Sequence, residues 1–184
     1  MYRSPLPPAH PLRRFLTAVT EQAFVARLGI GDFALIDYIA TMLTRFLRMD
    51  AIYRLRKPSG RPIEEVAEMV MLAEDLPPEG LTRREIHRHI GDFTLFWTGL
   101  FPEALQRLRS VYSKDFFVDY CEQGKRSYYI ASTFDEEPYR QESAVLRRLS
   151  AMFELCAYGL SEVRKELEQS EREGLLAPVR RVIH

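Results

Sequence analysis

The sequence predicts an all-α fold, a single-domain multi-helix bundle of about six or seven helices that ends in a long C-terminal helix. Prolines divide the chain into proline-free stretches of helix length, because helix interiors strongly exclude proline. Apolar residues recur at helical spacing within these stretches. Signals for β-strands are weak along the whole chain.

The composition is that of an ordinary globular protein. The chain has 184 residues, of which 46% are hydrophobic and 28% are charged. One domain is the default at this length, and we expect a Pro-rich arm over residues 1–11, a helical domain over 12–173 and a tail over 174–184. The 26 basic and 26 acidic residues cancel and are interleaved. A nucleic-acid partner is therefore not expected, since such proteins usually show a basic excess.

The sequence also favours a cytoplasmic protein. It contains no uncharged apolar run long enough to span a membrane, and its first residues lack the apolar segment of a secretory signal. The two cysteines, Cys121 and Cys156, each lie in an apolar helical pattern. We expect them to be buried free thiols, as in a reducing compartment.

The first two helices are predicted on either side of a glycine pair. One runs from about Leu12 to Leu28, and the second from Asp32 to about Leu55, because Gly29 and Gly31 interrupt a stretch that is too long for one ordinary helix. Asp32 has the residue type expected at the N-cap of the second helix.

Two further helices are predicted between the turn at residues 59–62 and Gly99. The first has an apolar face at helical spacing and ends in the Pro-rich segment 76–80. The second begins with Thr82 and Glu85, whose spacing matches a capping box. Pro102 then stands in the first-turn position of a further helical segment.

Residues 113–134 are predicted to be helical, with Ser113 as the N-cap. Gly124 lies in the middle of this stretch. It either breaks the helix or permits close packing against a neighbour, and its polar surroundings favour a break.

The last predicted helix runs from Tyr139 to Glu171 and has an a/d stripe over three heptads. A helix of this length extends beyond the main body of a globule of this size, so its stripe needs a partner from this chain or from a second copy. We therefore predict a homodimer, with another protein as an alternative partner. The residues assigned to this oligomer stripe are Leu146, Leu149, Phe153, Leu160, Val163 and Leu167.

A hexapeptide occurs twice in the chain. Ile30–Leu35 recurs as Ile90–Leu95 and differs only at the fifth position, where Ala34 corresponds to Thr94. The flanking residues match poorly. We interpret the recurrence as a coincidence, and two copies do not indicate a solenoid.

Glu85, His87, His89 and Asp92 form the densest polar cluster, and Glu85, His89 and Asp92 lie on one face of a helix. They are candidate metal ligands, but the Glu-x-x-His unit of di-metal carboxylate bundles is absent from the sequence. A structural role is favoured, and we expect no metal and no cofactor. Asp92 lies among apolar residues, so it needs a buried partner. Arg84, Arg88, His89 or an arginine from another helix would serve.

The segment Phe93–Phe101 is apolar nearly all round, which is typical of a helix buried on every side. We expect it to form the central element of the globule. A ligand pocket lined by Phe96, Trp97 and Phe101 is the alternative.

Motifs of nucleophilic, phosphate-binding or dinucleotide-binding sites are absent from the sequence. We therefore predict a non-enzymatic protein-interaction or regulatory domain that acts as a homo-oligomer. The first alternative is a metal-dependent helical-bundle enzyme centred on Glu85, His89 and Asp92. The second is a small-molecule sensor with an aromatic pocket near Trp97.

Overall fold

The computed structural model describes residues 6–47, 49–109 and 112–173, and these residues form nine α-helices and no β-strand. The all-α prediction is therefore confirmed for the described part of the chain. Two of the helices, α3 and α6, have only four residues, so the seven longer ones agree with the predicted number. The helices are α1 (Pro11–Glu21), α2 (Phe33–Phe46), α3 (Met49–Ile52), α4 (Val66–Glu74), α5 (Leu81–Leu100), α6 (Leu105–Leu108), α7 (Tyr120–Ser132), α8 (Arg140–Ala151) and α9 (Phe153–Arg172).

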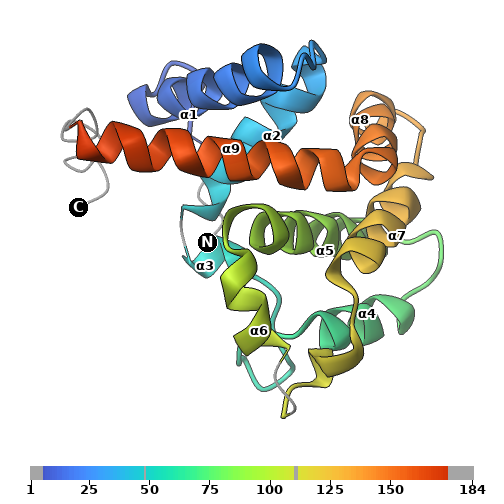
Figure 1. The fold of residues 1–184 in the computed structure, drawn as a ribbon. Helices are drawn as coiled ribbons and strands as arrows, with labels where there is room; N and C mark the ends of the chain where they lie inside the picture. The colour runs from blue at the N-terminus through green and yellow to red at the C-terminus, as the bar shows by residue number, and fades with distance from the viewer. Residues whose placement is uncertain (1–5, 48, 110–111, 174–184) are drawn as a thin grey trace.

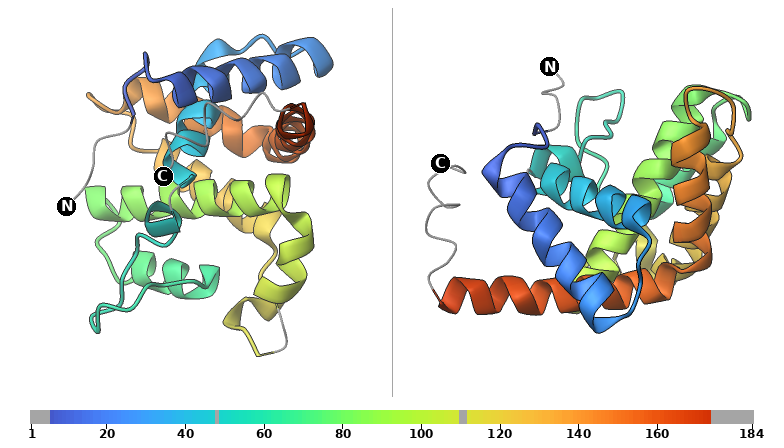
Figure 2. Two further views of the ribbon diagram at one scale, coloured as in Figure 1. Left: turned by 90° about the vertical axis from the view of Figure 1, so that its left-hand side faces the viewer. Right: turned by 90° about the horizontal axis from the view of Figure 1, so that it is seen from above.

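Helix α5 lies at the centre of the bundle. Every residue from His89 to Phe96 is buried, as expected for a helix that is apolar on all sides. Helices α4, α7 and α9 all pack against α5. Helix α9 crosses the molecule between α5 and α1, and α8 lies beside α7 (Figures 1 and 2). One hydrophobic core joins these elements.

The first two predicted helices are present, with different ends. A π-helical segment, η1 (Gln22–Arg27), continues α1 to the predicted end of the first helix. Asp32 caps α2 as predicted, and its Oδ1 accepts the Leu35 N–H at 3.1 Å. Helix α2 ends at Phe46 instead of about Leu55, because the chain turns there and returns through α3, which places Ile52 in the core.

The predicted capping box at the start of α5 is wrong. The helix begins at Leu81, with Gly80 as a cap that has no side-chain hydrogen bond. The Glu85 carboxylate accepts hydrogen bonds from Arg84 and Arg88 instead of a backbone N–H. Ion pairing with these two cations takes the place of the local cap.

The predicted helix over 113–134 is interrupted near its start. Ser113 caps the short 3₁₀ turn η3 (Lys114–Phe117), and α7 begins only at Tyr120 behind its own cap, Asp119. The cause lies in α4: buried Asp115 accepts the N–H groups of Val66 and Ala67 at the start of that helix. The chain must bend at η3 to place this carboxylate.

Gly124 does not break a helix. Helix α7 is continuous through it, and a Cβ built there would lie 2.4 Å from Phe153 and 2.5 Å from Thr94. The glycine therefore permits α7 to approach α5 and α9 closely. The expectation of a break is wrong because the deciding contacts come from distant residues.

We expect Gly124→Ala to lower the free energy of unfolding by about 1–3 kcal/mol, because the added methyl group overpacks the core. Urea denaturation measures the effect. The matched control is Gly31→Ala, where a Cβ meets no atom within 4 Å and no loss is expected. Equal midpoints for the two variants would contradict the packing role of Gly124.

The predicted C-terminal helix is divided in two. Met152 has φ −113° and ψ 23°, outside the helical range, and it separates α8 from α9. Helix α8 packs mainly on α7, whereas α9 packs on α5 and η1 (Figure 1). A single straight helix could not pack against both sets of neighbours. The bend at Met152 therefore arises from packing and not from a proline or glycine.

The predicted tail, 174–184, and the first five residues of the predicted arm lie outside the described residues. Within the described ranges, no helix combines the length and apolar character needed to cross a bilayer.

Candidate functional site

A buried carboxylate, Asp92, joins three helices. Its side chain is 1% exposed. The Tyr38 hydroxyl of α2 and the Tyr128 hydroxyl of α7 donate to its Oδ1 at 2.8 Å and 2.9 Å. Arg45, also from α2, donates to Oδ2. Asp92 therefore has the interhelical arginine that the sequence analysis considered, together with two tyrosines.

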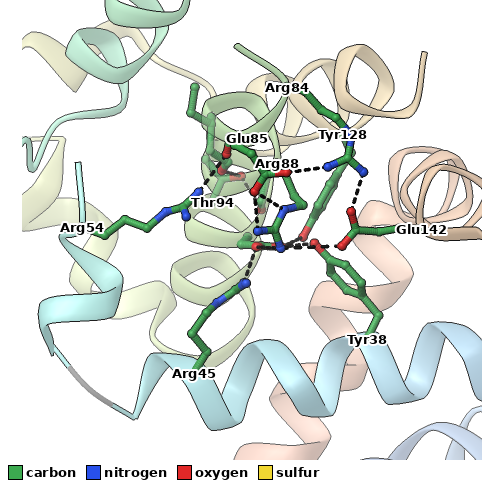
Figure 3. Close-up of polar contacts among 12 residues, drawn as sticks. Tyr38, Arg45, Arg54, Arg84, Glu85, Arg88, Thr94, Tyr128 and Glu142 are labelled. Carbon is green, nitrogen blue, oxygen red and sulfur yellow. Dashed lines mark hydrogen bonds and ion pairs between the residues drawn. The ribbon is translucent and has the colours of Figure 1, made fainter. Parts of the chain in front are cut away.

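Helix α5 carries three more charged side chains, Arg84, Glu85 and Arg88, in the two turns before Asp92 (Figure 3 labels the three). Arg88 lies between two carboxylates: its Nη2 donates to Glu85 at 2.7 Å, and its Nη1 is 3.9 Å from Asp92. Arg84 is fully buried, pairs with Glu85 and with Glu142 of α8, and stacks over an aromatic ring. We call Tyr38, Arg45, Arg84, Glu85, Arg88, Asp92, Tyr128 and Glu142 the polar cluster.

Three residues of the polar cluster, Tyr38, Tyr128 and Arg45, have pKa values that are raised in the folded protein. Burial, and then the Asp92 carboxylate, raise the pKa values of Tyr38 and Tyr128 well above the ordinary range. Burial lowers the pKa of Arg45, but the charge of Asp92, the interaction with Tyr38 and the hydrogen bond to Asp92 together outweigh burial and raise it. The tyrosines therefore remain proton donors in hydrogen bonds, and Arg45 remains charged.

The polar cluster forms one wall of a cavity of about 250 Å³ between α2 and α8, which we call the α2/α8 cavity. Helix α2 presents Tyr38 and Arg45 to it, α5 presents Arg88, and α8 presents Glu142. Its other lining residues are Ala34, Asp37, Thr41, Met42 and Val145. The arrangement offers hydrogen-bond donors, acceptors and a small apolar surface to a molecule of limited size.

The three candidate metal ligands do not converge. Glu85 faces Arg84 and Arg88, while Asp92 faces Tyr38, Tyr128 and Arg45. The His89 ring lies between aromatic rings, 5.8 Å from Phe46 and 6.3 Å from Phe93. Across the described residues, no group of three or more His, Cys, Asp or Glu side chains is arranged to hold a metal ion.

His87 and His89, two buried histidines of α5, are both neutral in the folded protein near neutral pH. Burial, and then the charges of Arg83 and Arg126, lower the pKa of His87 to about 4. Burial, and then Arg54, Arg45 and Arg88, lower the pKa of His89 well below its ordinary value. The unfolded chain therefore binds more protons than the folded chain at mildly acidic pH.

We expect the free energy of unfolding to fall as the pH is lowered from about 6.5 towards 4, because His87 protonates in the unfolded state first. Urea denaturation between pH 7.5 and 5 measures the slope while most carboxylates stay ionised. His87→Gln should reduce the slope without abolishing it, because the pKa of His89 is lowered as well. A flat profile for the wild type would contradict the neutral, buried imidazole.

Phe96, Trp97 and Phe101 do form a cluster. Their ring centroids lie 5.5 Å to 5.8 Å apart, in T-shaped and tilted contacts. The rings pack on one another, and none of the three lines the α2/α8 cavity. A ligand pocket at these residues stays a prediction.

The side chains of the predicted oligomer stripe face the core of their own chain. Leu146, Leu149, Phe153, Leu160 and Val163 are all 0% exposed, and Leu167 packs against the same core. The stripe thus finds its partner within the chain. The homodimer stays a prediction, and in this conformation it needs a different surface.

The sequence analysis missed Tyr38, Arg45, Tyr128 and Glu142 as site residues. One signal was present: Tyr38, Thr41 and Arg45 are polar and follow the spacing of a single helix face in a helix that is mostly apolar. No local pattern pointed to Tyr128 or Glu142, because both lie on other helices.

No protein-family model, curated protein or solved structure matches this chain.

Proposed function

We propose that the protein is a non-enzymatic small-molecule-binding domain and that its binding site is the α2/α8 cavity. The observation that carries the proposal is the wall of this cavity, where Arg45 and Arg88 reach both the cavity and a buried carboxylate. Burying such charges costs free energy, and an apolar replacement is often as stable. A role in ligand binding would explain why Arg45 and Arg88 line the α2/α8 cavity.

The size of the cavity limits the ligand. About 250 Å³ corresponds to roughly eight water volumes in the liquid. A small polar molecule therefore matches the space inside the cavity. The site also lacks an activated nucleophile, and its tyrosines and arginines keep their protons. Binding fits this set of groups better than catalysis.

The test is a screen of small polar metabolites by ligand-observed NMR and thermal shift. Ala34 lines the cavity at an exposed position and takes no part in the polar cluster, so Ala34→Phe narrows the cavity and leaves the charges in place. We expect this variant to lose binding. The control is Ala18→Phe, at an exposed helical alanine outside the cavity. Binding that survives Ala34→Phe, or no binding at all, would overturn the proposal.

Trp97 distinguishes this site from the aromatic pocket predicted from the sequence. It is the only tryptophan and does not line the α2/α8 cavity. A ligand that binds near Trp97 is expected to change its fluorescence. A ligand in the α2/α8 cavity is expected to leave the emission nearly unchanged while it raises the melting temperature.

A further inference from the structure

Two guanidinium groups meet at one oxygen of the buried carboxylate. Arg45 donates to Oδ2 of Asp92 through Nη2, and Nη1 of Arg88 lies 3.9 Å from the same oxygen. Both tyrosines donate to the other oxygen, Oδ1. Both carboxylate oxygens of Asp92 therefore have partners, and the guanidinium groups of Arg45 and Arg88 lie next to the same oxygen.

Neither arginine has used all of its donors. Among the described residues, the Nε of Arg45 is buried without a hydrogen-bond partner. The Nη1 of Arg88 is 3.9 Å from Asp92 and 3.8 Å from Glu142, which is too far for a hydrogen bond. Both side chains line the α2/α8 cavity. The exposed part of each side chain, 21% for Arg45 and 14% for Arg88, is what an acceptor in the cavity meets.

The chemistry of the acceptor follows from the groups around it. A carboxylate matches guanidinium groups in shape and charge and forms short, strong hydrogen bonds with them. The same wall contains the carboxylates of Glu142 and Asp37, which repel additional negative charge. The two lining carboxylates offset the two arginines, so a single carboxylate is repelled less than a dicarboxylate or a phosphate dianion.

We propose, resting on the proposed function above, that the α2/α8 cavity binds a small monocarboxylate whose carboxylate group lies against Arg45 and Arg88. The rest of the molecule extends towards Thr41, Met42 and Val145, which offer one hydroxyl and an apolar surface. Glu142 and Asp37 accept hydrogen bonds from a hydroxyl or amino group of the ligand. A small hydroxy or amino monocarboxylic acid satisfies these conditions.

Isothermal titration calorimetry at constant ionic strength tests the ligand class. The probes are 3-hydroxybutyrate, its neutral amide, glutarate and inorganic phosphate. We expect the monocarboxylate to bind at least about tenfold more tightly than the other three, because only it gains charge-assisted hydrogen bonds without repulsion. Equal binding of the amide, or tighter binding of glutarate or phosphate, would overturn the inference.

Arg45→Lys tests the residue assignment. Lysine keeps the positive charge beside Asp92 but loses the planar set of donors, so we expect about tenfold weaker binding of 3-hydroxybutyrate at a similar melting temperature. The control is Arg164→Lys, at a partly exposed arginine that pairs with Glu103 and Glu168. Unchanged affinity in Arg45→Lys would overturn the assignment.

The two proposals fail in different ways. If neutral metabolites bind and are lost in Ala34→Phe while 3-hydroxybutyrate does not bind, the binding function stands and the monocarboxylate inference is wrong. If neither the probes nor the metabolite screen gives binding that depends on Ala34, both are wrong.

Discussion

Replacing Asp92 by asparagine is expected to destabilise the protein by about 3–5 kcal/mol, because it leaves buried positive charge without its partner. Arg45 and Arg88 both lie against this carboxylate. Two tyrosine hydroxyls also lose a charged acceptor. A loss of this size is a large part of the stability of an ordinary domain. Urea or thermal denaturation of the purified variant measures it.

Two further variants are expected to lose less stability than Asp92→Asn. Tyr128→Phe removes one hydrogen bond to the same carboxylate and should cost about 1.5–3 kcal/mol, the usual range for a hydrogen bond to a charged group. Asp37→Asn removes an exposed carboxylate that pairs with Arg13 and should cost at most about 1 kcal/mol. If Asp92→Asn were no more damaging than Asp37→Asn, the polar cluster would not hold the helices together.

Leu160→Ala is expected to lower the free energy of unfolding by about 2–5 kcal/mol, as for other leucines that are truncated in a core. Leu160 is 0% exposed. Its side chain fills the space beside Gly99, where a built Cβ would lie 2.6 Å from the Cβ of Leu160. Truncation leaves a cavity between α9 and α5. Chemical denaturation at two protein concentrations measures the loss.

This experiment also separates a core role from an interface role for the C-terminal stripe. A core residue lowers stability equally at both concentrations, whereas a residue of a dimer interface changes the association measured by sedimentation velocity. The control is Leu155→Ala on the same helix, where the side chain is 43% exposed and the effect should stay within about 0.5 kcal/mol. A concentration-dependent loss in Leu160→Ala would favour the predicted homodimer interface.

The sequence was a good guide to most features that depend on a local interaction. Prolines limited the helices, and Asp32 was identified as a cap because the N–H groups that such a residue bonds lie within one turn of it. The burial of Asp92 was also predictable from its apolar neighbours. Helical periodicity identified the buried face of the last two helices, although it did not separate them.

Apart from the capping box at the start of α5, where Glu85 pairs with its neighbours Arg84 and Arg88, the main errors involve residues that are distant in sequence. The corner at Met152 has no local signal, since it arises where α8 and α9 turn towards different neighbours. The polar neighbours of Gly124 favoured a helix break, but the glycine is there because Phe153 and Thr94 pack directly against it. The candidate site depended on the same kind of contact: Asp92 and its partners Tyr38, Arg45 and Tyr128 are separated by 54, 47 and 36 residues.

The two copies of the repeated hexapeptide show most directly which features depend on the local sequence and which depend on the tertiary structure. In the first copy Asp32 caps α2 and pairs with Arg148 near the surface. In the second copy Asp92 lies in the middle of α5 and holds three helices together. The sequence by itself determined the helical periodicity and the residues to be buried, because these depend on neighbours within a turn or two. Only the tertiary structure decided the partners, because the packing of the whole chain brings distant side chains within bonding distance.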